Sequence, residues 1–243
     1  MYKNKRIIAI IPARKGSVGL KNKNTKELCG KPLIAHSIEK AKSSKYIDEV
    51  MVTTDCDRIT SIAKEYGANI PFTRPAKLSS STATSLDVVL HTLNYYETNF
   101  DDLYDYLILL EPTSPLREDD DIDNMIEKLI NNEKKYDSLT SIGEVNEHPS
   151  IVKKIKNNNL IPFCEELELT SRRQDNETAY FPYGVGYLVK TASLKKEKMF
   201  YTRRNDFYTI KKHQCYEIDD IYDFICVEAI MTHQNSKGDK DAI

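Results

Sequence analysis

Two patterns of apolar residues alternate along most of the chain. The continuous branched run Arg6–Pro12 is typical of a strand buried on both faces of a parallel sheet. Further strands are predicted at Glu49–Thr54, Asn69–Phe72, Tyr106–Leu110, Ser138–Ile142 and Gly184–Val189. Apolar residues three or four positions apart predict helices that begin near Pro32, Asp57, Ser85, Ile122 and Asp220. This alternation predicts an α/β fold with a doubly wound, mostly parallel sheet and helices on both faces, and a ligand site beyond the carboxyl ends of the strands.

Polar residues at the helix starts refine these boundaries. Asp57 is predicted as the N-cap of its helix, and Ser85 is a plausible N-cap whatever else it does. Asp220 and Asp223 are expected to cap the last helix and to complement the positive end of its dipole.

The alternation lapses after about Glu147. The segment 148–178 carries short, irregular β-like pieces in much polar sequence, and no linker rich in Gly, Ser or Pro bounds it. We therefore expect one domain over residues 1–243 with an inserted lobe at 146–182, packed against the core or against a second subunit.

Charge and composition narrow the classes of function. The 35 Lys and Arg residues nearly balance the 37 Asp and Glu residues, so the chain lacks the basic surface that nucleic-acid binding requires. No run approaches the roughly 20 apolar residues of a membrane span, and Ile7–Pro12 is too short for a signal peptide. Five cysteines without a C-x-x-C pair favour a reducing cytoplasm. Because the charges balance over the whole chain, any phosphate-binding site must rest on a local cluster of cations.

Four cations gather in one glycine-containing loop directly after the first buried strand. Arg14, Lys15, Lys21 and Lys23 flank two glycines and a serine there. Backbone N–H groups of such a loop form an anion nest, and an arginine forks onto phosphate oxygens. A solvated turn is the alternative from charge alone, but the position after the strand favours a triphosphate site. The G-x-x-x-x-G-K-[ST] and G-x-G-x-x-G spacings are absent, so an ATPase or an NAD-dependent dehydrogenase is not indicated.

Several motifs resemble one known family. The pieces IIPARKGSVGLKNKN, GKPLIAHSI, VTTD, TRPAKLSSSTATS, LLEPTSPLR, SRRQD and YEIDDIYDF occur in the order found in acylneuraminate (CMP-sialic acid-type) cytidylyltransferases. The resemblance runs from about Ile7 to Ile230, and CMP-Kdo synthetases look more distant. It implies a Rossmann-like nucleotidyltransferase core that transfers the CMP of CTP to the anomeric hydroxyl of a 2-keto-3-deoxy sugar acid and releases pyrophosphate, with Mg²⁺ or Mn²⁺. It also implies a homodimer that pairs through the inserted lobe.

The resemblance assigns a nucleotide side to the site. Arg14 and Lys23 match cations that grip the β- and γ-phosphates, and Arg74 matches an arginine near the cytosine. From the residues alone, Arg74-Pro75 could equally be a plain turn. The matched nucleotide-binding residues are Ala13, Arg14, Ser17, Gly19, Lys23, Asn24, Arg74, Ala83 and Ser85.

On the sugar side the chain departs from the family pattern. Glu111 stands where the sialic-acid enzymes carry Gln, and Tyr183 stands where they carry Asn. A carboxylate accepts hydrogen bonds but donates none unless protonated, which leaves the facing groups of the sugar open. The residues expected at the sugar are Glu111, Arg173, Gln174 and Tyr187.

Two carboxylates, Glu217 and Asp219, stand at positions i and i+2 before the last helix. On an extended segment they face the same way, and Mg²⁺ takes one or two carboxylates plus substrate phosphates. Asp219 is the expected metal ligand, with Glu217 beside it where the family has Asp. Arg14, Lys23 and Asp219 are the expected catalytic residues, and no general base or nucleophilic serine or cysteine is assigned.

Two kinds of function remain open. The first is a CMP-sugar acid synthetase for N-acetylneuraminate or another nonulosonic acid, with legionaminate, pseudaminate and Kdo as alternatives. The second is a non-catalytic nucleotide-binding homologue that has kept the fold.

Overall fold

The computed structural model describes residues 1–17, 19–100, 103–164 and 176–238. Within them, a six-stranded sheet has the order β10-β6-β9-β5-β1-β4. Its strands are β1 (Ile7–Pro12), β4 (Glu49–Thr53), β5 (Tyr106–Leu109), β6 (Ser138–Glu144), β9 (Tyr180–Lys190) and β10 (Asn205–Thr209). β9 runs antiparallel to both of its neighbours, β5 and β6, and the other pairs are parallel. The predicted mostly parallel α/β sheet is confirmed.

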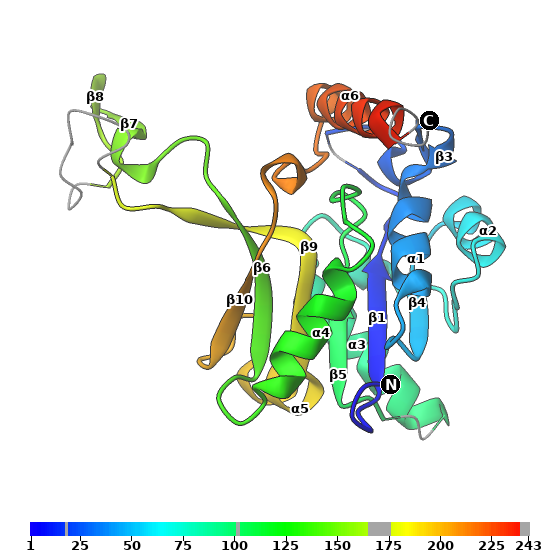
Figure 1. Cartoon of the computed structure of the whole chain (residues 1–243). Helices are drawn as coiled ribbons and strands as arrows, with labels where there is room; N and C mark the ends of the chain where they lie inside the picture. The colour runs from blue at the N-terminus through cyan, green and yellow to red at the C-terminus, as the bar shows by residue number, and fades with distance from the viewer. Residues whose placement is uncertain (18, 101–102, 165–175, 239–243) are drawn as a thin grey trace.

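Helices cover both faces of this sheet (Figure 1). They are α1 (Leu33–Ser43), α2 (Asp57–Glu65), α3 (Ser85–Phe100), α4 (Asp121–Asn131), α5 (Thr191–Glu197) and α6 (Ile221–Gly238). Ile7, Ala9 and Ile11 of β1 pack with α1, α2 and α4, while Ile8 and Ile10 pack with α3 and α5. Successive side chains of a strand point to opposite faces, so one apolar run supplies both halves of the core.

The carboxyl ends of the parallel strands carry most of the remaining short elements (Figure 1). These are β2 (Glu27–Leu28), β3 (Lys31–Pro32) and the 3-10 turns η1 (Lys23–Thr25), η2 (Ala76–Leu78) and η5 (Lys212–Gln214). α6 crosses this end of the molecule and packs through Phe224 and Val227 on Leu28 and Leu33. The loops that bear the predicted site therefore lie under a helix formed by the end of the chain.

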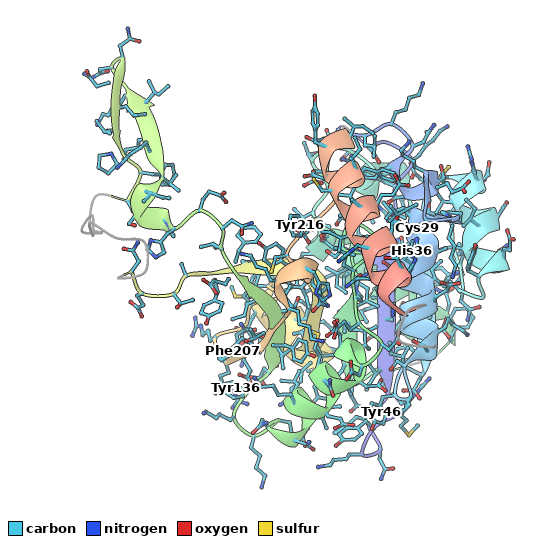
Figure 2. All side chains as sticks on the ribbon, turned by 45° about the horizontal axis from the view of Figure 1, so that its top comes forward. Cys29, His36, Tyr46, Tyr136, Phe207 and Tyr216 are labelled. Carbon is cyan, nitrogen blue, oxygen red and sulfur yellow. The ribbon has the colours of Figure 1, made fainter. Side chains whose placement is uncertain are left out.

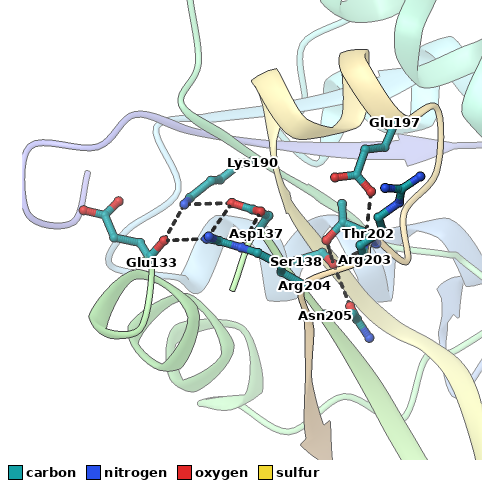
Figure 3. Close-up of polar contacts among 9 residues, drawn as sticks. All are labelled: Glu133, Asp137, Ser138, Lys190, Glu197, Thr202, Arg203, Arg204 and Asn205. Atoms are coloured by element: carbon teal, nitrogen blue, oxygen red, sulfur yellow. Dashed lines mark hydrogen bonds and ion pairs between the residues drawn. The ribbon is translucent and has the colours of Figure 1, made fainter. Parts of the chain in front are cut away.

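The opposite end of the sheet is held by ion pairs (Figure 3). The Asp137 carboxylate lies 3.0 Å from Lys190 Nζ and 2.8 Å from Arg204 Nε. Lys190 Nζ also donates to the Glu133 carbonyl at 2.6 Å. Asp137 precedes β6, Lys190 ends β9 and Arg204 precedes β10, so one carboxylate joins three strands at the end away from the site.

A two-stranded hairpin projects from the sheet within the predicted lobe (Figures 1 and 2). It consists of β7 (Lys153–Lys156) and β8 (Asn159–Pro162), preceded by the 3-10 turn η3 (Pro149–Ile151). β9 begins at Tyr180, inside the predicted lobe, and its first residues pair with β6. The bounds 146–182 of the lobe stay a prediction.

Three local expectations were wrong. Asn69–Phe72 forms only an isolated bridge from Asn69 to Met51, because Pro71 has no N–H with which to continue the ladder. Cys56, not Asp57, is the N-cap of α2. Thr84, not Ser85, caps α3, since its hydroxyl accepts from Asp87 N at 3.1 Å while the Asp87 carboxylate accepts from Thr84.

Among the helices of the described residues, none combines the length and the apolar character that crossing a membrane requires. Asp220 and Asp223 behave as expected at the start of α6. The Asp220 carboxylate accepts from the N–H groups of Tyr222 and Asp223, and the Asp223 carboxylate accepts from those of Asp219 and Asp220.

Candidate active site

A cleft of about 440 Å³ opens at the carboxyl ends of β1 and β5. Its wall combines the loop after β1, the segment that leads into α3, the loop after β5 and Asp219, two residues before the start of α6. The described residues that line it are Pro12, Arg14, Gly16, Ser17, Gly19, Lys23, Asn24, Arg74, Leu78, Ser80, Ala83, Thr84, Ser85, Val88, Glu111, Pro112, Thr113 and Asp219. The cleft therefore lies where a mostly parallel sheet is expected to bind its ligand.

Side-chain hydrogen bonds fix the loop after β1 at both ends. Lys15 N donates to Asp55 Oδ1 at 2.7 Å, which ties the loop to the end of β4. The 3-10 turn η1 contains the buried Asn24, whose Nδ2 donates to the Arg14 carbonyl at 3.2 Å and so ties the end of the loop to its start. The backbone on either side of the Arg14 side chain is thus held before any ligand binds.

The other cation of this loop meets the acidic segment before α6. Lys23 Nζ donates to the Ile218 carbonyl at 2.7 Å and to Asp219 Oδ1 at 3.0 Å. Gly19 packs against the same segment, so closely that a Cβ there would lie 2.3 Å from the Asp219 carbonyl oxygen. The cationic loop and the predicted metal ligand are consequently in direct contact.

Arg74 lies buried in the wall of the cleft, without an ion-pair partner among the described residues. Its Nε donates to Thr53 Oγ1 at 3.1 Å and its NH2 donates to the Thr53 carbonyl. Burial lowers the pKa of Arg74 to about 10, Arg14 acts in the same direction, and Asp55 opposes both. The guanidinium remains charged at neutral pH. Its orientation is fixed by hydrogen bonds to Thr53, the last residue of β4.

Arg117 gives the loop after β5 its shape. Its guanidinium donates to the Ser37 hydroxyl and to the carbonyls of four residues, Glu111, Ser114, Gly184 and Val185, at distances between 2.5 and 2.9 Å. Burial lowers the pKa of Arg117 to about 10, and Glu111 is the nearest opposing charge. Arg117 is therefore a structural cation that positions Glu111.

Two carboxylates meet beside Gly184 in different environments. Glu217 Oε1 accepts from Ser114 Oγ and from Gly184 N, both at 2.6 Å. A Cβ on Gly184 would lie 2.8 Å from Glu217 Oε1 and 2.9 Å from Glu111 Cβ. Burial, and next to it the charge of Glu217, raises the pKa of the Glu111 carboxyl, while Arg117 lowers it. The two acids are neighbours, but only Glu217 receives local donors.

The cleft gathers most of the residues predicted from the sequence. Those lining it are Arg14, Ser17, Gly19, Lys23, Asn24, Arg74, Ala83, Ser85, Glu111 and Asp219. Ala13 is buried beneath the cleft, and its N–H donates to the Thr53 carbonyl at 3.0 Å. Glu217 and Tyr187 do not line the cleft, and Arg173 and Gln174 fall outside the described residues.

The predicted metal ligands offer oxygens of unequal freedom. Asp219 is the more accessible, with its side chain 83% exposed and Oδ1 paired to Lys23. Glu217 Oε1 is already bound by two donors, which leaves Oε2 as the oxygen able to reach an ion. In the described residues, no group of three or more His, Cys, Asp and Glu side chains forms a ready-made metal site. This donor set suits an ion that takes few protein ligands and completes its shell with phosphate oxygens and water, as Mg²⁺ does.

Thr84 and Ser114 were missed as members of the site. Thr84 carries a readable signal, because T-x-x-D before an apolar run is the signature of a reciprocal cap. Ser114 carries none, since its partner Glu217 is 103 residues away in the sequence.

Comparisons with known proteins agree on one family. A model of the family described as "Cytidylyltransferase" matches residues 8–235. The N-acylneuraminate cytidylyltransferase of Escherichia coli O18:K1:H7 (strain RS218) is 33% identical over 96% of this chain and 53% of its own length. The pseudaminic acid cytidylyltransferase of Campylobacter jejuni (strain NCTC 11168) is 31% identical over 89% of this chain and 92% of its own. The chain spans about half the length of the N-acylneuraminate cytidylyltransferases it matches.

Among solved structures, a CMP:2-keto-3-deoxy-manno-octonic acid synthetase complexed with CTP superposes with a TM-score of 0.68. The match covers 94% of this chain and 99% of the other at 18% identity, which is a likeness of fold.

Proposed function

The chain belongs to the cytidylyltransferase family, and we propose that it transfers CMP from CTP to the anomeric hydroxyl of a nonulosonic acid, releasing pyrophosphate. The observation that carries the proposal is the contact between the cationic loop and Asp219 in one cleft. Arg14, Lys23, Asp219 and the buried Arg74 all line this cleft, and Lys23 is paired to Asp219. Cations for a triphosphate and a carboxylate for its metal thus meet at one point.

In this proposal the protein supplies position and charge rather than a covalent intermediate. Arg14 and Lys23 bind the β- and γ-phosphates and offset the charge that develops on the leaving pyrophosphate. Arg74, Ala83 and Ser85 also line the cleft, and in this proposal Arg74 lies near the cytosine while Ala83 and Ser85 contact the base and ribose. The acceptor hydroxyl attacks the α-phosphorus in line, and holding both substrates in that geometry removes much of the entropic barrier.

We propose that Asp219 binds the Mg²⁺ of the CTP complex, with Glu217 as the second carboxylate. The bound ion supplies charge neutralisation at the α-phosphate and polarisation of its oxygens. Lys23 holds Asp219 in the unliganded chain, so the lysine is available to the phosphates when the carboxylate turns to the ion.

The nonulosonic acid class is supported by the relatives, which are named for N-acylneuraminate and pseudaminic acid. Within that class, legionaminate and pseudaminate are the alternatives to N-acetylneuraminate, and Kdo is the alternative outside it. The test is pyrophosphate release from CTP and Mg²⁺ with a panel of these acids. We expect turnover with at least one nonulosonic acid and its loss in Asp219→Ala, whose fold is checked by circular dichroism. Turnover of UTP, GTP or ATP with an aldose phosphate in place of CTP would overturn the proposal, and CTP binding without turnover of any acid would favour the non-catalytic homologue.

We further propose that the protein acts as a homodimer and pairs through the β7–β8 hairpin. The hairpin projects away from the sheet and carries exposed apolar side chains, Ile155 at 78% and Leu160 at 72% exposure. Large apolar side chains gathered on a projecting element favour burial against another surface.

The five cysteines are all unpaired, which supports the proposal of a cytoplasmic location.

A further inference from the structure

The Glu111 carboxylate lies at the cleft, and no described residue donates a hydrogen bond to it. Its backbone is fixed, since its N–H donates to the Gly184 carbonyl at 3.3 Å and its carbonyl accepts from Arg117 NH2 at 2.8 Å. Within residues 1–17, 19–100, 103–164 and 176–238, no hydrogen bond reaches its side-chain oxygens. Among the described cations, Arg117 acts most strongly on Glu111, but its nitrogens donate to Ser37 and to backbone carbonyls. A half-buried carboxylate is thereby left to a ligand.

The surroundings of Glu111 are negative and poor in donors. Glu217 takes both the Ser114 hydroxyl and the Gly184 N–H, the two donors nearest to the pair of acids. A ligand group that carries a partial negative charge, such as an amide carbonyl oxygen, would be repelled here, whereas a group that carries positive charge would be attracted.

Two tyrosine rings lie near this carboxylate, although Tyr187 and Tyr201 are not among the residues that line the cleft. Tyr187 and Tyr201 pack edge to face with their centroids 5.8 Å apart and their planes at 85°. Tyr187 lies opposite Leu109, two residues before Glu111, in the β5–β9 pairing. Burial raises the pKa of both phenols, and the charge of Glu111 acts in the same direction on each. A carboxylate beside electron-rich ring faces is a common protein arrangement for an organic cation.

We propose, on the basis of the cytidylyl transfer proposed above, that the acceptor of this protein is a sugar acid with a positively charged nitrogen substituent, an ammonium or amidinium group, which lies against Glu111 and the Tyr187–Tyr201 pair. The substituent pairs with the carboxylate and covers the ring faces. A neutral N-acetyl group at the same position presents its carbonyl oxygen as well as its N–H, and the Glu111 carboxylate, which only accepts hydrogen bonds when ionised, disfavours that oxygen. Glutamine at position 111 would offer both a donor and an acceptor and would suit the neutral amide instead.

The test compares two nonulosonic acids that differ only in whether one amino substituent is free or acetylated, with the pair made at each amino position of the sugar. The readout is the ratio of kcat/KM for the two acids, from pyrophosphate release with CTP and Mg²⁺. We expect the native chain to favour the cationic acid by about tenfold or more at one position. Because both acids are measured on the same protein with the same CTP, an effect of a substitution on CTP binding cancels in this ratio.

Four variants separate charge, rings and fold. Glu111→Gln should reverse the preference, and Glu111→Asp, which keeps the charge, should retain part of it. Tyr201→Leu should reduce the ratio, whereas the matched control Tyr201→Phe, which keeps the ring, should leave it near the native value. Thermal unfolding of each variant checks that the fold survives.

Preference of the native chain for the acetylated acid, or an equal ratio in the native chain and Glu111→Gln, overturns the inference while leaving cytidylyl transfer in place. If no acid is turned over, the proposed function fails instead. Calorimetric binding of the same two acids to the native chain and to Glu111→Gln then decides the cation preference without catalysis.

Discussion

At the residue scale, the two described glycines of the cationic loop differ in what surrounds them. A Cβ on Gly19 would lie 2.3 Å from the Asp219 carbonyl oxygen and 3.2 Å from its carbon, both backbone atoms, whereas a Cβ on Gly16 would meet nothing within 4 Å. Backbone cannot yield as a flexible side chain does. Gly19 is therefore required for the loop to approach the acidic segment, and Gly16 is not required for that contact.

We expect Gly19→Ala to lower stability by about 1–3 kcal/mol, as overpacking does, and to raise KM for CTP because Lys23 loses its alignment with Asp219. The measurements are the Tm and the CTP dependence of pyrophosphate release. Gly16→Ala is the matched control and should leave the Tm unchanged or slightly higher. Equal effects of the two substitutions on the Tm would contradict the close approach at Gly19.

His36 gives a second residue-scale prediction, on pH. It lies in α1 under the end of α6 (Figure 2), and its Nε2 donates to the Leu28 carbonyl at 2.9 Å. Burial lowers its pKa from the ordinary value of 6.5, although the hydrogen bond opposes this, and Lys31 lowers it further. The folded state therefore favours neutral His36, and its contribution to stability is present above pH 6.5 and lost as the pH falls from there towards the folded pKa.

Urea unfolding between pH 7.5 and 5.5 tests this prediction. The free energy of unfolding should fall on acidification, and His36→Gln should fall less steeply than the native chain. His233→Gln is the control, because His233 is an exposed histidine on α6, and it should keep the native slope. A slope unchanged in His36→Gln would assign the pH dependence to other groups.

At the scale of single elements, the start of α6 positions Asp219. The Asp223 carboxylate accepts from Asp219 N at 2.9 Å and from Asp220 N at 3.0 Å. Removing an N-terminal capping acceptor costs about 0.5–2 kcal/mol. The backbone of the predicted metal ligand is thus held by a cap on the helix that follows it.

Asp223→Ala should lower the free energy of unfolding by about 1 kcal/mol and reduce kcat, since Asp219 is then less well fixed. Asp57→Ala is the matched control: Asp57 is an exposed acid in the first turn of α2, whose N-cap is Cys56. It should cost about 0.5 kcal/mol or less, through the helix dipole alone, and leave kcat unchanged. Loss of stability without loss of activity in Asp223→Ala would show that the cap does not position Asp219.

These elements show which features of the structure could be predicted from the sequence and which could not. Buried strands such as β1 and β5 were predictable because an apolar run records burial on both faces. Caps were less so, because Thr84 and Ser85 are chemically alike and the choice depends on Asp87. The cationic loop is local in sequence and was found, but the donors of Glu217 and the Tyr187–Tyr201 pair come together only through the sheet, and no spacing along the chain records such contacts.

At the scale of the whole molecule, the two ends of the sheet have separate tasks. Asp137 and its two cations hold β6, β9 and β10 together at the amino end of β6 (Figure 3). The carboxyl ends of β1 and β5 carry the cleft, whose charged residues include Arg14, the buried Arg74 and the Lys23–Asp219 ion pair. β6 leads into the β7–β8 hairpin and pairs with β9, whose Gly184 lies beside Glu111, so an interface formed by the hairpin would be linked to the cleft through two paired strands.

That connection makes the oligomeric state a test of the whole arrangement. Ile155 and Leu160 are directly opposite each other in the hairpin and lie on the same face, so they form one exposed apolar pair. A charged side chain there should be tolerated in the fold but not in an apolar interface.

We expect light scattering to give twice the single-chain mass for the native chain and the single-chain mass for Leu160→Asp, with a lower kcat/KM for the sugar acid in the variant. Leu103→Asp, an exposed leucine on the body of the protein, is the matched control and should remain a dimer. A native monomer that is active at nanomolar concentration, or a dimer that persists in Leu160→Asp, would show that the hairpin is not the pairing surface.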